Sequence, residues 1–240
     1  MTLGEAQVRL WHALGMGPRW RERGARLCGD AVAAAATLDW DELQAAVASC
    51  TACALSRTRK QTVFAAGSRN ARWMFIGEAP GAEEDARGEP FVGQAGKLLD
   101  NMLAEIGLDR RCESAAGRGE DAGGREAVYI ANVIKCRPPH NRNPEPAEVA
   151  ACEPFLLRQI ELLQPRILVL MGRIAVQSLL QTEASIASLR GRVHAFSHGG
   201  RSYPVVVTYH PAYLLRTLAD KAKSWEDLCL ARATLEAAGG

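Results

Sequence analysis

The chain has 240 residues, of which 48% are hydrophobic, and a formal net charge of +2. This length and composition suit one globular domain with appendages, and so small a charge indicates no partner by itself. No run approaches the roughly twenty apolar residues that span a bilayer, and the start, MTLGEAQVRLW, lacks the pattern of a secretory signal. We therefore expect a cytoplasmic protein without membrane contact, whose seven cysteines are reduced.

Residues 1–37 differ in composition from the rest of the chain. They are rich in Arg, Gly and Ala, and we interpret them as an N-terminal extension or linker. Asp39 is a candidate N-cap for a helix that runs through Ala48, so the folded domain is predicted to occupy residues 38–240.

Four short apolar runs, which are continuous rather than alternating, predict strands buried on both faces of a parallel sheet. They span residues 73–76, 128–133, 167–171 and 204–208. Helical patterns occupy 98–106, 149–163, 173–180 and 225–235. The alternation predicts an α/β fold: a three-layer α/β/α sandwich with a central, mainly parallel four-stranded sheet. The Gly-rich, charged stretch of residues 109–127 is expected to be a flexible surface insertion.

Four cysteines have the spacing of a metal centre. Cys50 and Cys53 form a C-x-x-C pair, and Cys136 and Cys152 follow far downstream. A tight pair with two distant thiols suits four-point ligation of a soft centre, and a 4Fe–4S cluster is the favoured interpretation. Zinc, whose sites usually show two short ligand pairs, and unligated core thiols are the alternatives.

Polar and aromatic residues follow the predicted strands. Glu78 lies in the turn GEAPG after the first strand, Phe91 comes shortly afterwards, Asn132 ends the second strand, and His210 follows the last. Ligands of open parallel sheets bind beyond the carboxyl ends of the strands. A carboxylate, an aromatic ring, an amide and an imidazole at this edge could recognise a flat heterocycle.

The blocks GEAPG, PFVG, NVIKCRPP and HPAYLLR, in this order and with this four-cysteine frame, resemble the family 4 uracil-DNA glycosylases. These are iron–sulfur members of their superfamily, and the resemblance covers roughly residues 40–235. It implies the uracil-DNA glycosylase-like fold, a 4Fe–4S cofactor, and hydrolysis of the N-glycosidic bond of uracil in DNA. The expected product is an abasic site, which begins base-excision repair. Single- or double-stranded uracil-containing DNA is the expected partner of a monomer.

The resemblance also implies roles for particular residues. Uracil must be flipped from the helix, stacked on Phe91 and read at its edge by Asn132. His210 would donate a hydrogen bond to the uracil O2 as negative charge develops. The turn formed by Gly77, Glu78 and Ala79 would line the pocket.

The turn departs from the better-known uracil glycosylases, which carry a water-positioning aspartate where this chain has Ala79. The acid role must then lie elsewhere, with Glu78 and Glu84 as candidates. We favour Glu84 for positioning water or stabilising the sugar cation, and Glu78 for shaping the pocket.

Basic side chains near the same edge are predicted to contact DNA phosphates, and an apolar segment after His210 is predicted to fill the space that the flipped base leaves. These candidates are Arg57, Lys60, Lys135 and Arg137 for phosphates, and Leu214, Leu215 and Arg216 after His210.

Three other functions stay open at this point. A related protein could trap uracil-DNA without turnover, although the short RPPHNRNP segment makes His140 a poor candidate for the reactive histidine of such traps. A sister-family glycosylase with broader damaged-base specificity is the second. A purely structural or regulatory iron–sulfur protein is the third.

Overall fold

The computed structural model describes residues 35–112 and 124–238. Most of the predicted N-terminal extension and the middle of the 109–127 insertion therefore lie outside the described residues. Within them, Ala35 is only 1% exposed and belongs to the hydrophobic core. No helix of the described ranges is long and apolar enough to cross a bilayer.

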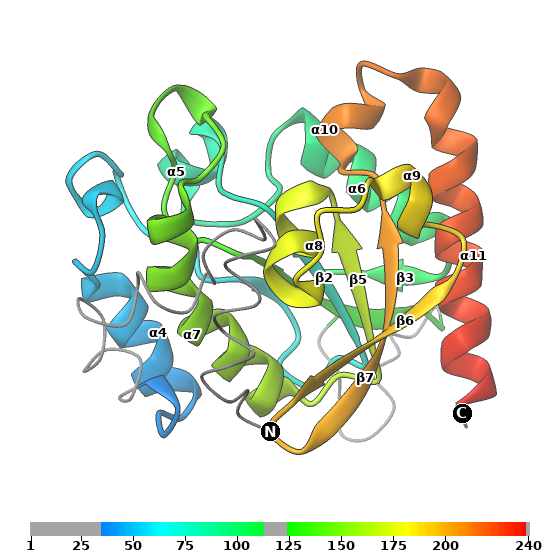
Figure 1. Cartoon of the computed structure of the whole chain (residues 1–240), viewed down its shortest axis with the longest axis horizontal. Coiled ribbons are helices and arrows are strands. Elements are labelled where there is room, and N and C mark those ends of the chain that lie inside the picture. Colours follow the sequence, from blue (N-terminus) through cyan, green and yellow to red (C-terminus); the bar gives the residue numbers. More distant parts are fainter. Residues whose placement is uncertain (1–34, 113–123, 239–240) are drawn as a thin grey trace, which may run out of the picture.

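Four parallel strands form the centre of the sheet, as predicted. In spatial order they are β4 (Glu126–Asn132), β2 (Trp73–Gly77), β5 (Ile167–Met171) and β7 (Arg201–Thr208). Every residue of β2, β4 and β5 is buried, which is why their sequences are continuous apolar runs rather than alternating, apart from the polar ends of β4. Strands β5 and β7 point toward helix α10 (Pro211–Leu214), so the carboxyl ends of the sheet lie at that end of the molecule (Figure 1).

The expected count of four strands is wrong, because the described sheet has seven. The additional strands are β1 (Ala66–Gly67), β3 (Leu108–Asp109) and β6 (Val193–His198). β1 and β6 pair antiparallel at the two ends of the sheet, and β3 pairs parallel with β4. β1 and β3 have two residues each, too few for a periodic signal, and the residues of β6 alternate between exposed and partly buried. The sequence therefore did not reveal these three strands.

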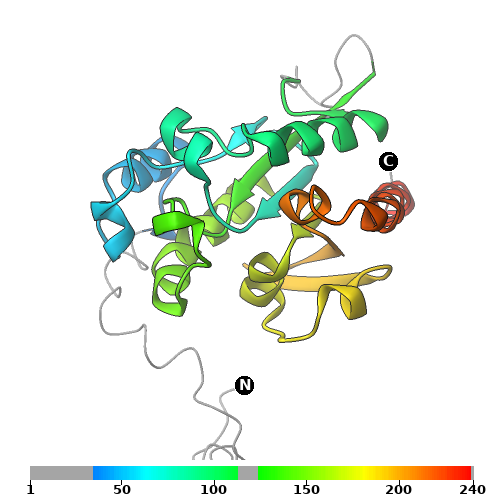
Figure 2. The same ribbon diagram turned by 90° about the horizontal axis from the view of Figure 1, so that it is seen from above.

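Helices cover both faces of the sheet and make the predicted three layers. One face packs against α4 (Trp40–Ser49), α7 (Pro146–Leu163) and α8 (Arg173–Leu180). The opposite face packs against α6 (Gln94–Glu105) and α11 (Lys221–Ala237). Figure 2 shows α6 along one side of the sheet and α7 with α8 on the other.

The helix ends refine the sequence predictions. Asp39 caps α4 as expected: its side chain accepts from the backbone N–H groups of Asp41 and Glu42. Helices α6, α7 and α11 each begin three or more residues earlier than their apolar periodicity indicates, because polar first turns carry no hydrophobic signal. The remaining short helices are η1 (Ala54–Arg57), α5 (Ala82–Arg87), η2 (Pro139–Asn141), α9 (Ile186–Leu189) and η3 (Leu218–Asp220).

Candidate active site and cysteine cavity

Gly77 and Asn132 end adjacent parallel strands and lie opposite each other in the register of β2 and β4. A Cβ atom on Gly77 would lie 2.5 Å from Asn132 Oδ1 and 2.5 Å from the ring tip of Phe91. Glycine is therefore required here by the close approach of two predicted site residues. The structure thus brings Gly77, Phe91 and Asn132 together at the carboxyl edge of the sheet.

Asn132 presents an unpartnered acceptor. The residue is 2% exposed, and its Oδ1 atom is buried without a hydrogen-bond partner among the described residues. Leaving such a group unpaired costs about 1–3 kcal/mol. An orphaned amide oxygen at a strand end suits a ligand that brings its own N–H donor.

Phe91 lies beside His210 and has an unusual backbone. The two ring centroids are 5.4 Å apart with an interplanar angle of 30°. The φ angle of Phe91 is 55°, in the left-handed region that costs a bulky residue about 1–3 kcal/mol. A Cβ on Gly96 would lie 1.7 Å from the Phe91 carbonyl oxygen, so the first turn of α6 packs directly against this strained backbone.

His210 is the N-cap of α10, and this position fixes its tautomer. The backbone N–H of Ala212 donates to His210 Nδ1 over 3.1 Å, so Nδ1 is an acceptor. Burial, reinforced by the Arg216 guanidinium, lowers the pKa of His210 from 6.5 to about 4. The ring is therefore neutral near pH 7 and carries its proton on Nε2, which makes Nε2 a hydrogen-bond donor.

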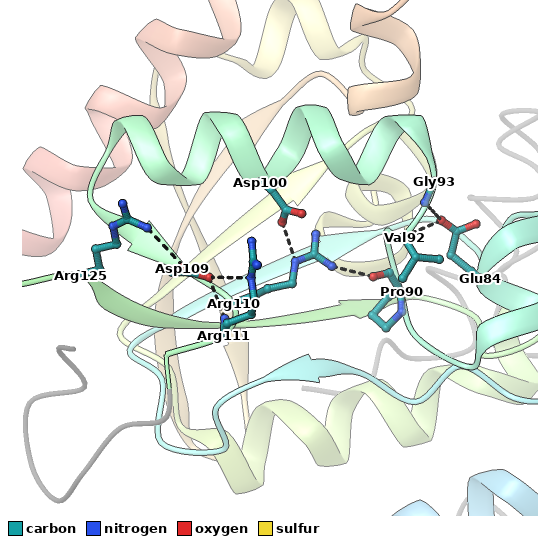
Figure 3. A network of polar contacts seen from close by, with 9 residues as sticks. All are labelled: Glu84, Pro90, Val92, Gly93, Asp100, Asp109, Arg110, Arg111 and Arg125. Atoms are coloured by element: carbon teal, nitrogen blue, oxygen red, sulfur yellow. Dashed lines mark hydrogen bonds and ion pairs between the residues drawn. The ribbon is translucent and has the colours of Figure 1, made fainter. Parts of the chain in front are cut away.

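The two candidate acids have different surroundings. Both oxygens of Glu84 accept backbone hydrogen bonds. The N–H of Gly81 donates over 3.1 Å, and those of Val92 and Gly93, which Figure 3 shows, donate over 2.9 and 3.0 Å. The carboxylate of Glu78 accepts no hydrogen bond within the described ranges, and burial raises its pKa despite the opposing effect of Arg173. Glu84 thus holds two loops together, and Glu78 is the carboxylate with unoccupied acceptors.

The four predicted ligand cysteines line one cavity. It is partly open to solvent and is bordered by Cys50, Cys53, Cys136 and Cys152. Cys152 lies within α7, in the helix that the sequence predicts over residues 149–163. Tertiary structure therefore joins thiols that are up to a hundred residues apart in the chain.

Three of these sulfurs already accept hydrogen bonds. Arg59 Nη1 donates to Cys136 over 3.1 Å, the Lys135 N–H donates to Cys152 over 3.2 Å, and the Ala52 N–H donates to Cys50 over 3.5 Å. Burial raises the pKa of Cys53 and Cys136, and raises that of Cys152 to about 12. Such thiols stay protonated until a metal deprotonates and binds them.

All four predicted ligands are thiols, a donor set that fits a soft metal centre such as a 4Fe–4S cluster. The N–H donors to sulfur are also typical of the surroundings of Fe–S clusters.

Two of the predicted DNA contacts are wrong because the side chains are buried. Lys135 is 1% exposed, and its Nζ donates to the Asn132 carbonyl oxygen at 2.8 Å and to Gln159 Oε1 at 2.6 Å. Burial lowers the pKa of Lys135 to about 8. Leu214 is fully buried in α10, which packs on α6. Neither a phosphate nor a base step can reach these groups.

The other candidates for DNA contact lie at or near the surface. Leu215 is 42% exposed, and Leu218, which the sequence analysis did not select, is 64% exposed in the same segment. Arg57, Lys60 and Arg216 are exposed, and Arg137 is half-buried with its Nε bonded to Asn141. Two exposed leucines and an exposed arginine therefore follow His210 closely in the chain.

The fold and the residues at the carboxyl edge of its sheet define the class of protein. The family model of the uracil DNA glycosylase superfamily matches residues 64–229, and the chain belongs to that superfamily.

Proteins with similar sequences indicate which branch of the superfamily this chain resembles. The chain is 42% identical to a type-4 uracil-DNA glycosylase of Archaeoglobus fulgidus over 179 residues, which are 73% of this chain and 82% of the relative. It is 41% identical to the type-4 enzyme of Thermotoga maritima over 178 residues, 74% of this chain and 83% of the relative. The chain is 37% identical to a type-5 uracil-DNA glycosylase of Thermus thermophilus over 142 residues, which are 58% of this chain and 61% of the relative.

Proposed function

We propose that this protein is a uracil-DNA glycosylase, a monofunctional hydrolase that removes uracil from DNA and leaves an abasic site for base-excision repair. The observation that carries the proposal is the buried, unpartnered Oδ1 of Asn132, which faces the edge where Phe91 and His210 meet. The type-4 relatives support the same activity.

Asn132 would read the edge of the base. Uracil offers an N–H donor at N3 and an acceptor at O4, which match an amide oxygen and an amide NH₂. Cytosine has an acceptor at N3 and a donor at C4, so it would leave both amide groups mismatched. Discrimination of about 1–3 kcal/mol follows for each buried group left unpaired.

Phe91 would supply the stacking surface. A base between Phe91 and His210 would separate the rings by about 7 Å, two van der Waals contacts of ~3.5 Å. The observed 5.4 Å leaves no room for that arrangement. We therefore place uracil against Phe91 with its O2 edge toward His210, while Gly77 and Ala79 line the turn beside it.

Hydrolysis requires charge stabilisation at both ends of the breaking bond. Neutral His210, with its proton on Nε2, would donate to O2 as the uracil becomes an anion. Glu78, whose oxygens are free of other described partners, would position water and stabilise the sugar cation. This assignment exchanges the roles that the sequence suggested, because both oxygens of Glu84 are already bonded to backbone amides.

Cys50, Cys53, Cys136 and Cys152 would hold a 4Fe–4S cluster, which would tie together loops that are distant in the chain. We place the protein in a reducing compartment such as the cytoplasm, which would keep metal-ligating thiols available. We also propose that the protein works as a monomer on single- or double-stranded DNA.

The first test is release of free uracil from an oligonucleotide with one deoxyuridine, with enzyme well below substrate. The parent protein should turn over many times. His210→Ala and Asn132→Ala should each lose at least tenfold in rate, since each removes a hydrogen bond to a charged or buried group. A cytosine-containing oligonucleotide is the matched control and should not react.

The test also separates the rival functions. A single burst that leaves protein bound to DNA would indicate a trap, and release of other damaged bases at a similar rate would indicate a broader glycosylase. Inert protein with an intact cluster would exclude the proposed function.

A further inference from the structure

A charged network outside the predicted site holds the backbone around Phe91. Arg110 follows β3 and is nearly buried, with 7% of its side chain exposed. Its Nε donates to Asp100 Oδ1 over 2.6 Å, and its Nη1 donates to the Pro90 carbonyl oxygen over 2.8 Å. Figure 3 shows Arg110 between helix α6, which carries Asp100, and the segment that precedes Phe91.

Glu84 holds the other side of the same residue. Its Oε1 accepts from the backbone of Val92 and Gly93, directly after Phe91. A cation thus fixes the carbonyl before Phe91, and an anion fixes the two amides after it. Phe91 itself has the left-handed φ of 55°, which a bulky side chain adopts only when its surroundings impose it.

We propose that Arg110, oriented by Asp100, is a positioning residue that holds the Phe91 turn in its strained form and so aims the aromatic ring at the base. The proposal rests on the proposed function, in which Phe91 stacks on uracil. The guanidinium connects helix α6, through Asp100, to the carbonyl oxygen of Pro90. Within the described residues, no backbone hydrogen bond joins Pro90 to α6. Charge-assisted bonds of this kind are stronger than neutral ones, which suits them to hold an unfavourable backbone.

Arg110→Met is the direct test, because methionine keeps the apolar stem but lacks every donor. Arg111→Met is the matched control: the neighbouring arginine is 82% exposed and contacts only Asp109 among the described residues. Arg110→Met should raise the inhibition constant of free uracil by about tenfold, the loss expected for one charge-assisted bond. The affinity for an abasic-site oligonucleotide, which has no base to stack, should stay within about twofold of the parent.

A double-mutant cycle links the effect to Phe91. In a Phe91→Leu background, the loss of uracil affinity caused by Arg110→Met should largely disappear, because the ring that Arg110 positions is no longer present. A full additional loss in that background would overturn the proposal. If Arg110→Met folds poorly, Asp100→Asn provides the same test with a smaller expected loss.

Hydrogen exchange gives a readout that does not depend on activity. The amides of Val92 and Gly93 should exchange at least tenfold faster in Arg110→Met than in Arg111→Met, with the β5 amides unchanged. Unchanged exchange together with unchanged uracil inhibition would overturn the proposal. If the parent protein releases no uracil, the proposed function fails, and these amides still decide whether Arg110 holds the turn.

Discussion

At the scale of single residues, the site combines a neutral imidazole with a carboxyl group of raised pKa. Burial, reinforced by the Arg216 guanidinium, keeps His210 neutral, and burial raises the pKa of Glu78 against the opposing charge of Arg173. Burial is the largest cause of both shifts, because it disfavours the charged form of each group. The shifts carry the pKa of His210 below, and that of Glu78 above, the ordinary carboxyl value of 4.5, and both favour the neutral form of the side chain.

This difference predicts the pH profile of uracil release. Glu78 acts as a carboxylate, so the single-turnover rate should rise with pH through a pKa above the ordinary 4.5 and then level. His210 should contribute no limb near 6.5, because it is already neutral there. Measurement between about pH 4.5 and 8 tests this.

Glu78→Gln should lower the rate and flatten the acid limb, and Glu84→Gln, which keeps an acceptor oxygen for the loop amides, is the comparison. A limb near pH 6.5 that vanishes in His210→Asn would show that the histidine titrates during the reaction and would contradict the assignment.

At the scale of elements, the buried Lys135 joins the end of strand β4 to helix α7. Its Nζ bridges the Asn132 carbonyl and Gln159, and Gln159 Nε2 donates to the Tyr129 hydroxyl at 2.9 Å. This chain of hydrogen bonds connects the end of β4 to the layer that also holds Cys152. Lys135 therefore supports the site from beneath rather than touching DNA.

Replacing Lys135 with Met should lower the free energy of unfolding by about 1–3 kcal/mol, because two buried acceptors lose their donor. Denaturant unfolding measures this. The double variant Lys135→Met with Gln159→Leu should recover little of the loss, because it removes one orphaned acceptor but also the amide that donates to the Tyr129 hydroxyl and the Phe64 carbonyl oxygen. Equal stability of Lys135→Met and the parent would exclude the supporting role.

The cysteine cavity couples η1, the loop after β4 and helix α7. Cys136→Ala should abolish the visible absorption of a cluster, lower the iron content, and weaken DNA binding because the adjacent Arg137 loop loses its anchor. Cys229→Ala, which alters an exposed thiol, should change none of these. Zinc in place of iron in the purified protein, or iron-free protein that binds DNA normally, would contradict the prediction.

At the scale of the whole molecule, the candidate DNA surface surrounds the carboxyl edge of the sheet. Exposed Arg216 and the apolar residues Leu215 and Leu218 flank His210, while the buried Lys135 lies below. Because only exposed cations displace counterions from DNA, the two kinds of basic residue should differ in their salt dependence.

Arg216→Ala should reduce the slope of log affinity against log salt concentration by about one phosphate contact. Lys135→Met should leave that slope unchanged at temperatures where it is folded. Fluorescence titration of a labelled oligonucleotide over a range of salt concentrations provides the measurement. An equal change of slope in both variants would place Lys135 at the DNA surface after all.

The sequence alone determined the central sheet, the cap of α4, the four-cysteine set and the residues that gather at the strand ends. These features are local: continuous apolar runs, a capping residue, and side chains that directly follow strands. Strands β1, β3 and β6 were not predicted, because β1 and β3 are very short and no residue of β6 is fully buried. They are recognisable only from their pairing with neighbouring strands.

Only the tertiary structure decided which charged and apolar groups are buried. Lys135 donates a hydrogen bond to Gln159, which is 24 residues away in the chain. Arg110 lies in a stretch whose composition predicts a surface loop, yet it donates to Asp100 and to the Pro90 carbonyl oxygen. Glu84 likewise reaches the amides around Phe91 through a turn of the chain. A charged side chain is buried only where distant groups supply its hydrogen bonds, and no local pattern contains those partners.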